Sequence, residues 1–234
     1  MSVYERLKRM HAWLLPGACT LCAEAPAKEG DFCTGCERAL PGLGACCPRC
    51  AVPLDGLQDE VTLPCGQCQQ HPPRYLSVHA PFRYAPPIDR LVQGAKYSGR
   101  LDWLAVLGRR LADHVRPRAS AVDAVVPVPL HRLRLRERGY NQSLELARLT
   151  VDRLGLPLTL GLERTRPTPP QASLPRAQRS QNVRGAFAAN GEFSNLRLAL
   201  IDDVMTSGAT VGAATRCLLD AGAASVEVWV VART

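Results

Sequence analysis

Residues 75–234 alternate between short apolar runs and stretches in which apolar side chains recur every three or four positions. The apolar runs have the length of strands and occur at Tyr75–Tyr84, Ala124–Val128, Leu196–Ile201 and Val226–Val231. The helical spacing predicts helices at Ile88–Tyr97, Asp102–Val115, Gly139–Leu154 and about Ala209–Ala221. Strands that alternate with helices predict a mainly parallel sheet, so residues 75–234 are expected to form one α/β domain.

One segment of this domain follows neither period. Residues 164–184 contain five arginines, no acidic residue and few apolar side chains. This composition is typical of a long functional loop. We therefore expect a mobile loop at about 162–185, with a short helix after Pro175.

The first 74 residues are rich in cysteine, glycine and proline and cannot bury much apolar surface. They therefore need disulfides or bound metal ions to stabilise a fold. Nine of the ten cysteines lie in residues 19–68, and eight of them form four Cys-x-x-Cys pairs: Cys19/Cys22, Cys33/Cys36, Cys47/Cys50 and Cys65/Cys68. Two such pairs complete a tetrahedral four-thiolate site, because the two-residue spacer lets both sulfur atoms face one metal. Residues 1–74 are therefore predicted to be a double zinc-ribbon module with two structural zinc ions. Redox pairs, iron–sulfur ligands and disulfides fit less well.

The spacing does not decide whether the pairs combine sequentially or crosswise. Cys46 is expected to be a spare thiol or to replace its neighbour Cys47. Cys217 lies on the face of a predicted helix and is expected to be an ordinary residue of the hydrophobic core. The module could staple the fold, or it could contact nucleic acid or protein.

Charge divides the chain in the same place as composition. Residues 1–70 hold six Lys/Arg and eight Asp/Glu, a net charge of −2, whereas residues 71–234 hold 23 and 13, a net charge of +10. Such an excess favours an anionic partner, either a phosphorylated small molecule or nucleic acid, although a solvated basic surface would have the same composition. No apolar run is long enough to span a bilayer, and Ala12–Leu15 is too short for a signal peptide. We expect a cytoplasmic protein without membrane insertion.

The segment Leu198–Thr210 has the residue types that bind a sugar phosphate. A hydrophobic strand delivers Asp202 and Asp203 to its carboxyl end, where α/β sheets bind ligands. A helix N-terminus follows, whose N–H groups, hydroxyls and dipole suit a phosphate monoester: Thr206, Ser207, Gly208, Ala209 and Thr210. Two acids beside a phosphate would repel it unless a polyol or Mg²⁺ lay between them, so they are predicted to bind two ribose hydroxyls.

Two acids followed by a Thr/Ser-Gly-x-Thr loop closely resemble the binding motif for 5-phosphoribosyl-1-pyrophosphate (PRPP) in type I phosphoribosyltransferases. Three further stretches resemble the ComF family of competence and gluconate-utilisation-associated proteins: Val126–Arg132, Arg138–Gln142 and the positions Gln171, Arg179 and Asn182–Phe187. The resemblance covers essentially the whole chain. It implies a type I phosphoribosyltransferase fold, a mainly parallel sheet flanked by helices, with an N-terminal zinc-ribbon module.

The resemblance also implies how PRPP and Mg²⁺ would be held. Asp202 and Asp203 would be the catalytic residues that fix the ribose, and the Thr206–Thr210 loop would hold the 5-phosphate. Pyrophosphate would meet the loop of Pro129, Leu130, His131 and Arg132, and Arg164 and Arg179 would belong to the flexible loop that closes over it. The run Val126–Pro129 departs from the Gly-containing pyrophosphate loop of many salvage enzymes. Side-chain charge could replace its missing N–H donors, from Arg132, Arg134, Arg136 and Arg138.

Three functions are compatible with these residues. The family resemblance implies a PRPP-binding protein of DNA uptake that contacts single-stranded DNA, with Arg134 and Arg136 as candidates, and meets proteins of the uptake machinery. A nucleobase-salvage phosphoribosyltransferase is the second. A zinc-ribbon interaction protein on a non-catalytic transferase fold is the third, and the intact acids and phosphate loop count against it. The first is the predicted function, with Mg²⁺-dependent phosphoribosyl transfer favoured over binding alone.

Overall fold

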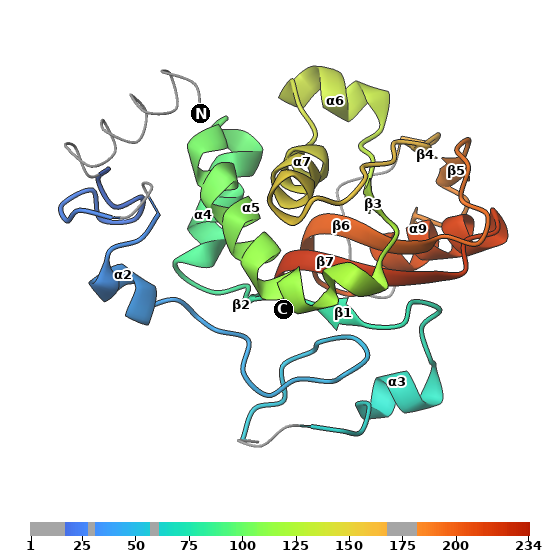
Figure 1. Cartoon of the computed structure of the whole chain (residues 1–234), viewed down its shortest axis with the longest axis horizontal. Helices are drawn as coiled ribbons and strands as arrows, with labels where there is room; N and C mark the ends of the chain where they lie inside the picture. Colours follow the sequence, from blue (N-terminus) through green and yellow to red (C-terminus); the bar gives the residue numbers. More distant parts are fainter. Residues whose placement is uncertain (1–16, 28–30, 57–60, 168–181) are drawn as a thin grey trace.

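The computed structural model describes residues 17–27, 31–56, 61–167 and 182–234. Its centre is a parallel sheet with the strand order β1-β7-β6-β3, in which β2 also pairs with β7 (Figure 1). These strands are β1 Val78–His79, β2 Phe82–Arg83, β3 Ala124–Pro127, β6 Arg197–Met205 and β7 Ser225–Arg233. A separate antiparallel pair joins β4 (Leu162–Arg164) to β5 (Phe187–Ala189). Because the main strands are parallel, their carboxyl ends meet at one edge of the sheet.

Helices pack against both faces of this sheet. One face carries α4 (Ile88–Tyr97), α5 (Leu101–Val115) and α7 (Gln142–Leu154), and the other carries α9 (Ala209–Asp220). A hydrophobic core fills the space between the sheet and the helices on each face. In β6, Ala199 and Ile201 lie in the core of the α5 face, and Leu198 and Leu200 lie in the core of the α9 face, because side chains alternate along a strand. Burial on both faces explains why the central strands are continuous apolar runs.

The cysteine-rich residues attach to the sheet on two different sides (Figure 1). The first part contains α2 (Thr34–Arg38) and packs Phe32 into the core of the α5 face, where Asp31 and Glu37 form ion pairs with Arg109 and Arg110. The second part contains α3 (Gly66–Gln70) and packs into the core of the α9 face. Each part therefore supports a different region of the sheet.

The predicted fold class is confirmed, and the helix predicted at Ile88–Tyr97 has these bounds. The single strand predicted at Tyr75–Tyr84 is wrong: β1 and β2 are separate, with Pro81, which cannot donate to a ladder, between them. The helix predicted from Gly139 begins at Gln142, because Gly139 ends the short helix α6 (Arg132–Arg138) with φ +83°.

A 3-10 helix, Arg116–Ala121, connects α5 to β3. Across the four described ranges, none of the helices combines the length and the hydrophobicity that a transmembrane span requires.

Candidate functional site

Strand β6 carries two adjacent acids near its carboxyl end. The strand runs through Asp202 and Asp203 to Met205, so both acids lie on the strand, which continues beyond its predicted end at Ile201. Asp202 Oδ1 accepts hydrogen bonds from Ser143 Oγ at 2.8 Å and from the backbone N–H of Asp203 at 2.9 Å. Asp203 Oδ2 lies 2.9 Å from Lys96 Nζ. Residues of α7 and α4 thus hold the two carboxylates in place.

The two carboxylates have unequal electrostatic environments. Burial, followed by the negative charge of Asp203, raises the pKa of Asp202 to about 6, and Lys96 and the Ser143 hydrogen bond oppose this rise. Burial alone would lower the pKa of Lys96, but the charge of Asp203 raises it above its ordinary value. Two carboxylates against one ammonium leave an acceptor-rich edge, which suits a polyol or a divalent cation.

The strand leads through a short loop into α9. Gly208 caps this helix with φ +78°, a left-handed conformation that favours glycine. A Cβ at this position would lie 2.7 Å from Met205 Cε. The backbone N–H of Ala209 points to Ser207 Oγ at 3.4 Å, and the first turn of α9 contains no acidic residue. The loop therefore combines N–H groups, a hydroxyl and the positive end of a helix dipole, a combination that binds phosphate.

A cleft of about 440 Å³ connects the acids with this loop. Its wall includes most of the residues predicted from the sequence: Pro129, Leu130, Arg164, Asp202, Asp203, Thr206, Ser207, Gly208, Ala209 and Thr210. His131 and Arg132 are not part of the wall. His131 is 7% exposed, and its Nδ1 accepts a hydrogen bond from the backbone N–H of Leu133 at 3.3 Å, so it caps α6. The second half of the predicted pyrophosphate loop is thus the start of a helix.

Arg164 brings the base of the predicted flexible loop to the cleft. It is the last residue of β4, and the β4–β5 pair brackets the loop on both sides. Burial lowers the pKa of Arg164, and the nearby charge of Asp202 opposes this effect. Its guanidinium lies 5.6 Å from the centroid of the Phe187 ring. Arg179 and the helix predicted after Pro175 lie outside the described residues.

Several residues of the wall were not predicted from the sequence, among them Lys96, Tyr97 and Ser143. A usable signal existed for Lys96. It follows the buried Val92 by four positions and so interrupts the apolar stripe of α4, where a charged side chain is unusual. No comparable signal marks Ser143, because its contact with Asp202 depends on how α7 packs against β6.

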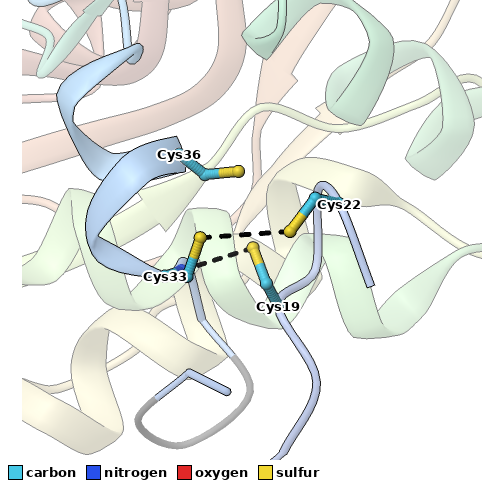
Figure 2. A group of neighbouring side chains, drawn as sticks. All are labelled: Cys19, Cys22, Cys33 and Cys36. Carbon is cyan, nitrogen blue, oxygen red and sulfur yellow. Dashed lines mark hydrogen bonds between the residues drawn. The ribbon is translucent and has the colours of Figure 1, made fainter. Parts of the chain in front are cut away.

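The eight paired cysteines form two groups of four. The Sγ atoms lie within 4.8 Å of one another in each group, which are Cys19, Cys22, Cys33 and Cys36, and Cys47, Cys50, Cys65 and Cys68. Figure 2 shows the first group, in which the four sulfur atoms approach one another from the Cys19–Cys22 turn and from the start of α2. The pairs therefore combine sequentially, and Cys46 and Cys217 belong to neither group.

Both groups have the dimensions of a zinc–thiolate tetrahedron. Zn–S bonds of about 2.3 Å place sulfur atoms about 3.8 Å apart. The sulfur atoms of the second and third cysteines lie 3.9 Å apart in the first group and 3.8 Å apart in the second. In each group the backbone N–H of the third cysteine also donates to the sulfur of the first, at 3.3 and 3.2 Å, and such outer bonds orient ligands. The two groups fit two structural zinc ions.

The basic helix α6 lies beside the cleft. Of its arginines, Arg134 and Arg138 line a second hollow of about 300 Å³, whereas Arg132 and Arg136 are exposed elsewhere on the helix. Tyr97 belongs to the walls of both the cleft and the hollow and is 74% exposed. The Arg138 guanidinium lies 5.6 Å from the centroid of its ring. A basic, aromatic surface thus adjoins the acid edge.

Comparison with known proteins places the chain in a family. A double zinc ribbon domain matches residues 10–69. The chain is 34% identical over 227 residues to the DNA utilization protein YhgH of Salmonella typhi, which covers 94% of this chain and 98% of that protein. Competence protein F of Haemophilus influenzae is 30% identical over 217 residues, with 88% and 92% covered. Among solved structures, the glutamine PRPP amidotransferase from B. subtilis is 27% identical with a TM-score of 0.37, and the match covers 54% of this chain and 25% of that one. With a double zinc ribbon match and relatives at least 30% identical over nearly their whole length, this chain belongs to the ComF family.

Proposed function

We propose that this protein binds PRPP and transfers its phosphoribosyl group, and that it does so in a process that handles single-stranded DNA. The observation that carries the proposal is the meeting of Asp202 and Asp203 with the Gly208-capped loop in one cleft. Two carboxylates suit the hydroxyls of a ribose, and a helix N-terminus suits its 5-phosphate. The printed names of the relatives, a DNA utilization protein and a competence protein, support the DNA part.

The cleft offers a complementary group for each part of PRPP. The ribose hydroxyls would donate hydrogen bonds to Asp202 and Asp203. The loop of Thr206–Thr210 would bind the 5-phosphate. Pyrophosphate, which would arrive with Mg²⁺, would extend toward Pro129 and Leu130 and the first turn of α6. His131 and Arg132 remain predicted contacts, since both stand at that helix start. Arg164, which also lines the cleft, would add positive charge.

The reaction follows from this placement. A nitrogen nucleophile would form a bond to C1 of the ribose and lose its proton, while the bond from C1 to pyrophosphate breaks. The transition state would carry positive charge on the ribose ring, beside Asp202 and Asp203. Catalysis would then consist mainly of positioning the ribose and of stabilising the leaving group.

Pyrophosphate release from Mg²⁺–PRPP tests this proposal. The intact protein would be assayed with a panel of nucleobases, with and without single-stranded DNA, and PRPP binding would be measured by calorimetry. We expect PRPP binding and an acceptor-dependent release that DNA alters. Release with one free base and no effect of DNA would identify a salvage transferase instead. Absence of PRPP binding would leave a zinc-ribbon interaction protein on a non-catalytic fold.

The hollow between α4 and α6 is the surface that we propose for single-stranded DNA and for partners of the uptake machinery. Exposed tyrosines provide stacking platforms for bases, each worth about 1–3 kcal/mol, and arginines bind the phosphates between them. Tyr97 lies where the hollow meets the cleft, with Arg134 and Arg138 on the wall of the hollow. A base stacked there would lie beside the proposed ribose position.

Replacing Arg134 or Tyr97 with alanine is expected to weaken binding of a labelled single-stranded oligonucleotide. The loss of affinity caused by Arg134→Ala should shrink as the salt concentration rises. The slope of log K against log salt concentration should become shallower by about 0.7, because one phosphate contact is removed. The loss for Tyr97→Ala should be largely independent of salt. Fluorescence anisotropy from low to moderate salt measures both. Arg136→Ala, on the exposed side of α6, is the matched comparison and should have the smaller effect; the reverse ranking would move the DNA to the outer side of the helix.

Affinity for Mg²⁺–PRPP is expected to fall about tenfold between pH 7 and pH 5. Asp202 in the free protein has its pKa raised to about 6, and only its ionised form can accept hydrogen bonds from ribose at both oxygens. Protonation therefore competes with the ligand below pH 6 and no longer competes above it. Calorimetry across this range measures the profile. The phosphates of PRPP also titrate near pH 6, and the residual binding of Asp202→Asn reports their share. If affinity depended equally on pH in the wild-type protein and in Asp202→Asn, a titrating role for Asp202 would be excluded.

A further inference from the structure

Arg233 joins the second cysteine group to the proposed phosphate loop. It is the last residue of β7 and is 5% exposed. Its Nε donates to the carbonyl oxygen of Cys50 at 2.9 Å. Its Nη1 donates to the carbonyl oxygen of Met205 at 3.1 Å and to that of Thr206. One planar guanidinium therefore fixes a residue of the four-cysteine site and the start of the loop in a single rigid arrangement.

A buried tyrosine lies at the same junction. Tyr75 is 5% exposed and belongs to the same core cluster as Cys50, Cys68 and Met205. A Cβ on Gly208 would lie 3.7 Å from the Tyr75 hydroxyl oxygen, so the tyrosine lies directly behind the glycine of the loop. The loop is thus supported from behind by side chains that also pack against the second cysteine group.

A groove runs between the second cysteine group and the loop. It has a volume of about 670 Å³ and is lined by Cys50 and Cys68 and also by Ser207, Gly208 and Ala209. The same three loop residues line the cleft that contains the acids. Tyr75 and Arg233 line the groove as well, so a shift of the second cysteine group would reach the loop through these two side chains.

The first cysteine group is attached elsewhere. Its neighbour Phe32 packs into the core of the α5 face, and Asp31 and Glu37 pair with Arg109 and Arg110 on α5. The contacts with Arg233 and Tyr75 lie in the core of the opposite face. Two groups with the same geometry thus have different neighbours, which provides an internal comparison.

We propose that the second four-cysteine site, acting through Arg233, positions the 5-phosphate loop, so that occupancy of this site by zinc, and not of the first, sets the affinity for Mg²⁺–PRPP. Without zinc, nothing holds the four cysteine side chains together, and the backbone at Cys50 becomes free to move. Arg233 then loses a buried acceptor, and the carbonyl groups that it holds at Met205 and Thr206 are free to turn. The N–H groups of the loop no longer converge on one point, and a preorganised anion site is lost. This inference rests on the proposed function of the loop.

Site-specific variants test it in the full-length protein. Cys33→Ser and Cys65→Ser remove the third cysteine of the first and second group, and both residues are partly buried. Each variant should retain one of the two zinc ions, as measured by elemental mass spectrometry. Cys65→Ser is expected to raise the Kd for Mg²⁺–PRPP about tenfold or more, as outer supports of a site typically do, whereas Cys33→Ser should change it less than about twofold.

Arg233→Lys separates positioning from loss of metal. It keeps the positive charge but not the planar fork, so both zinc ions should remain while the Kd rises severalfold. Arg197→Lys, at the exposed opposite end of β6, is the control. Hydrogen exchange of residues 205–212 provides a readout without PRPP and should accelerate in Cys65→Ser and Arg233→Lys only. Equal exchange and equal Kd values in the two cysteine variants would overturn the coupling. A wild-type protein that does not bind PRPP would overturn the proposed function, while the exchange rates would still decide the coupling.

Discussion

Simultaneous replacement of Asp202 and Asp203 by asparagine is expected to raise the Kd for Mg²⁺–PRPP by about 100-fold or more. Hydrogen bonds to charged groups contribute about 1.5–3 kcal/mol each, and two such bonds to the ribose would be weakened together. Calorimetry with Mg²⁺–PRPP measures the loss. The single variants should each show part of it, and the two effects should not add, since the acids are adjacent and share Lys96 as a cationic neighbour.

Stability should respond differently in the two single variants. The folded-state pKa of Asp202 is raised to about 6, above its ordinary value of 3.8, so ionised Asp202 destabilises the fold as pH rises through that range. Asp202→Asn removes this cost at neutral pH and should not lower the melting temperature. Asp203→Asn leaves Lys96 buried without its carboxylate and should lower it.

Asp152→Asn, an exposed acid on α7, is the matched control and should change neither affinity nor stability. An unchanged Kd in the double variant would remove these acids from the ligand site. A loss of affinity with a collapsed melting transition would instead mean that the acids only support the fold, and the melting curves distinguish the two.

The parts of the fold with a strong local period could be predicted from the sequence. The apolar stripe of Ile88–Tyr97 gives α4 its observed bounds, because the same stripe packs against the sheet. The stretch Tyr75–Tyr84 is apolar enough for one strand, yet β7 pairs with its two halves separately. Strand ends depend on partners: β6 continues to Met205 because β7 accompanies it to Arg233, a register that no local pattern encodes.

In the candidate site, too, the residues that lie in one local segment could be predicted, and those that depend on distant contacts could not. The acids and the phosphate loop are contiguous in the sequence, so their chemistry could be read from one segment. Arg233 gives no comparable sign, since it ends an apolar strand and bonds to Cys50, 183 positions earlier. Helix α6 was missed for a related reason. Its alternating leucines and arginines do not form an apolar stripe, and its ends are set by a His131 cap and a left-handed Gly139.

Purified protein is expected to contain two zinc ions per chain, and removal of both should unfold residues 19–68 while the sheet stays folded. Binding of structural zinc to small ribbons supplies about 10–16 kcal/mol, more than such a short segment can gain from burial alone. The sheet depends less on metal because the buried faces of β6 and β7 pack mainly against helices. Residues 1–74 and 75–234 would then behave as the module and the domain that the sequence predicts.

Metal release by a chelator, followed by hydrogen exchange, measures this. Protection should vanish in residues 31–56 and persist in β6 and β7. Thiol counting should rise by eight as the metal leaves, because Cys46 and Cys217 lie outside both groups. Cys217→Ser is the control and should keep two zinc ions and full protection. Protein prepared without chelator that contains no zinc, or thiols that appear only after reduction, would replace the ribbons with a disulfide framework. Loss of protection throughout the sheet on chelation would mean that the cysteine groups hold the whole fold, since both pack into cores that also contain the central strands.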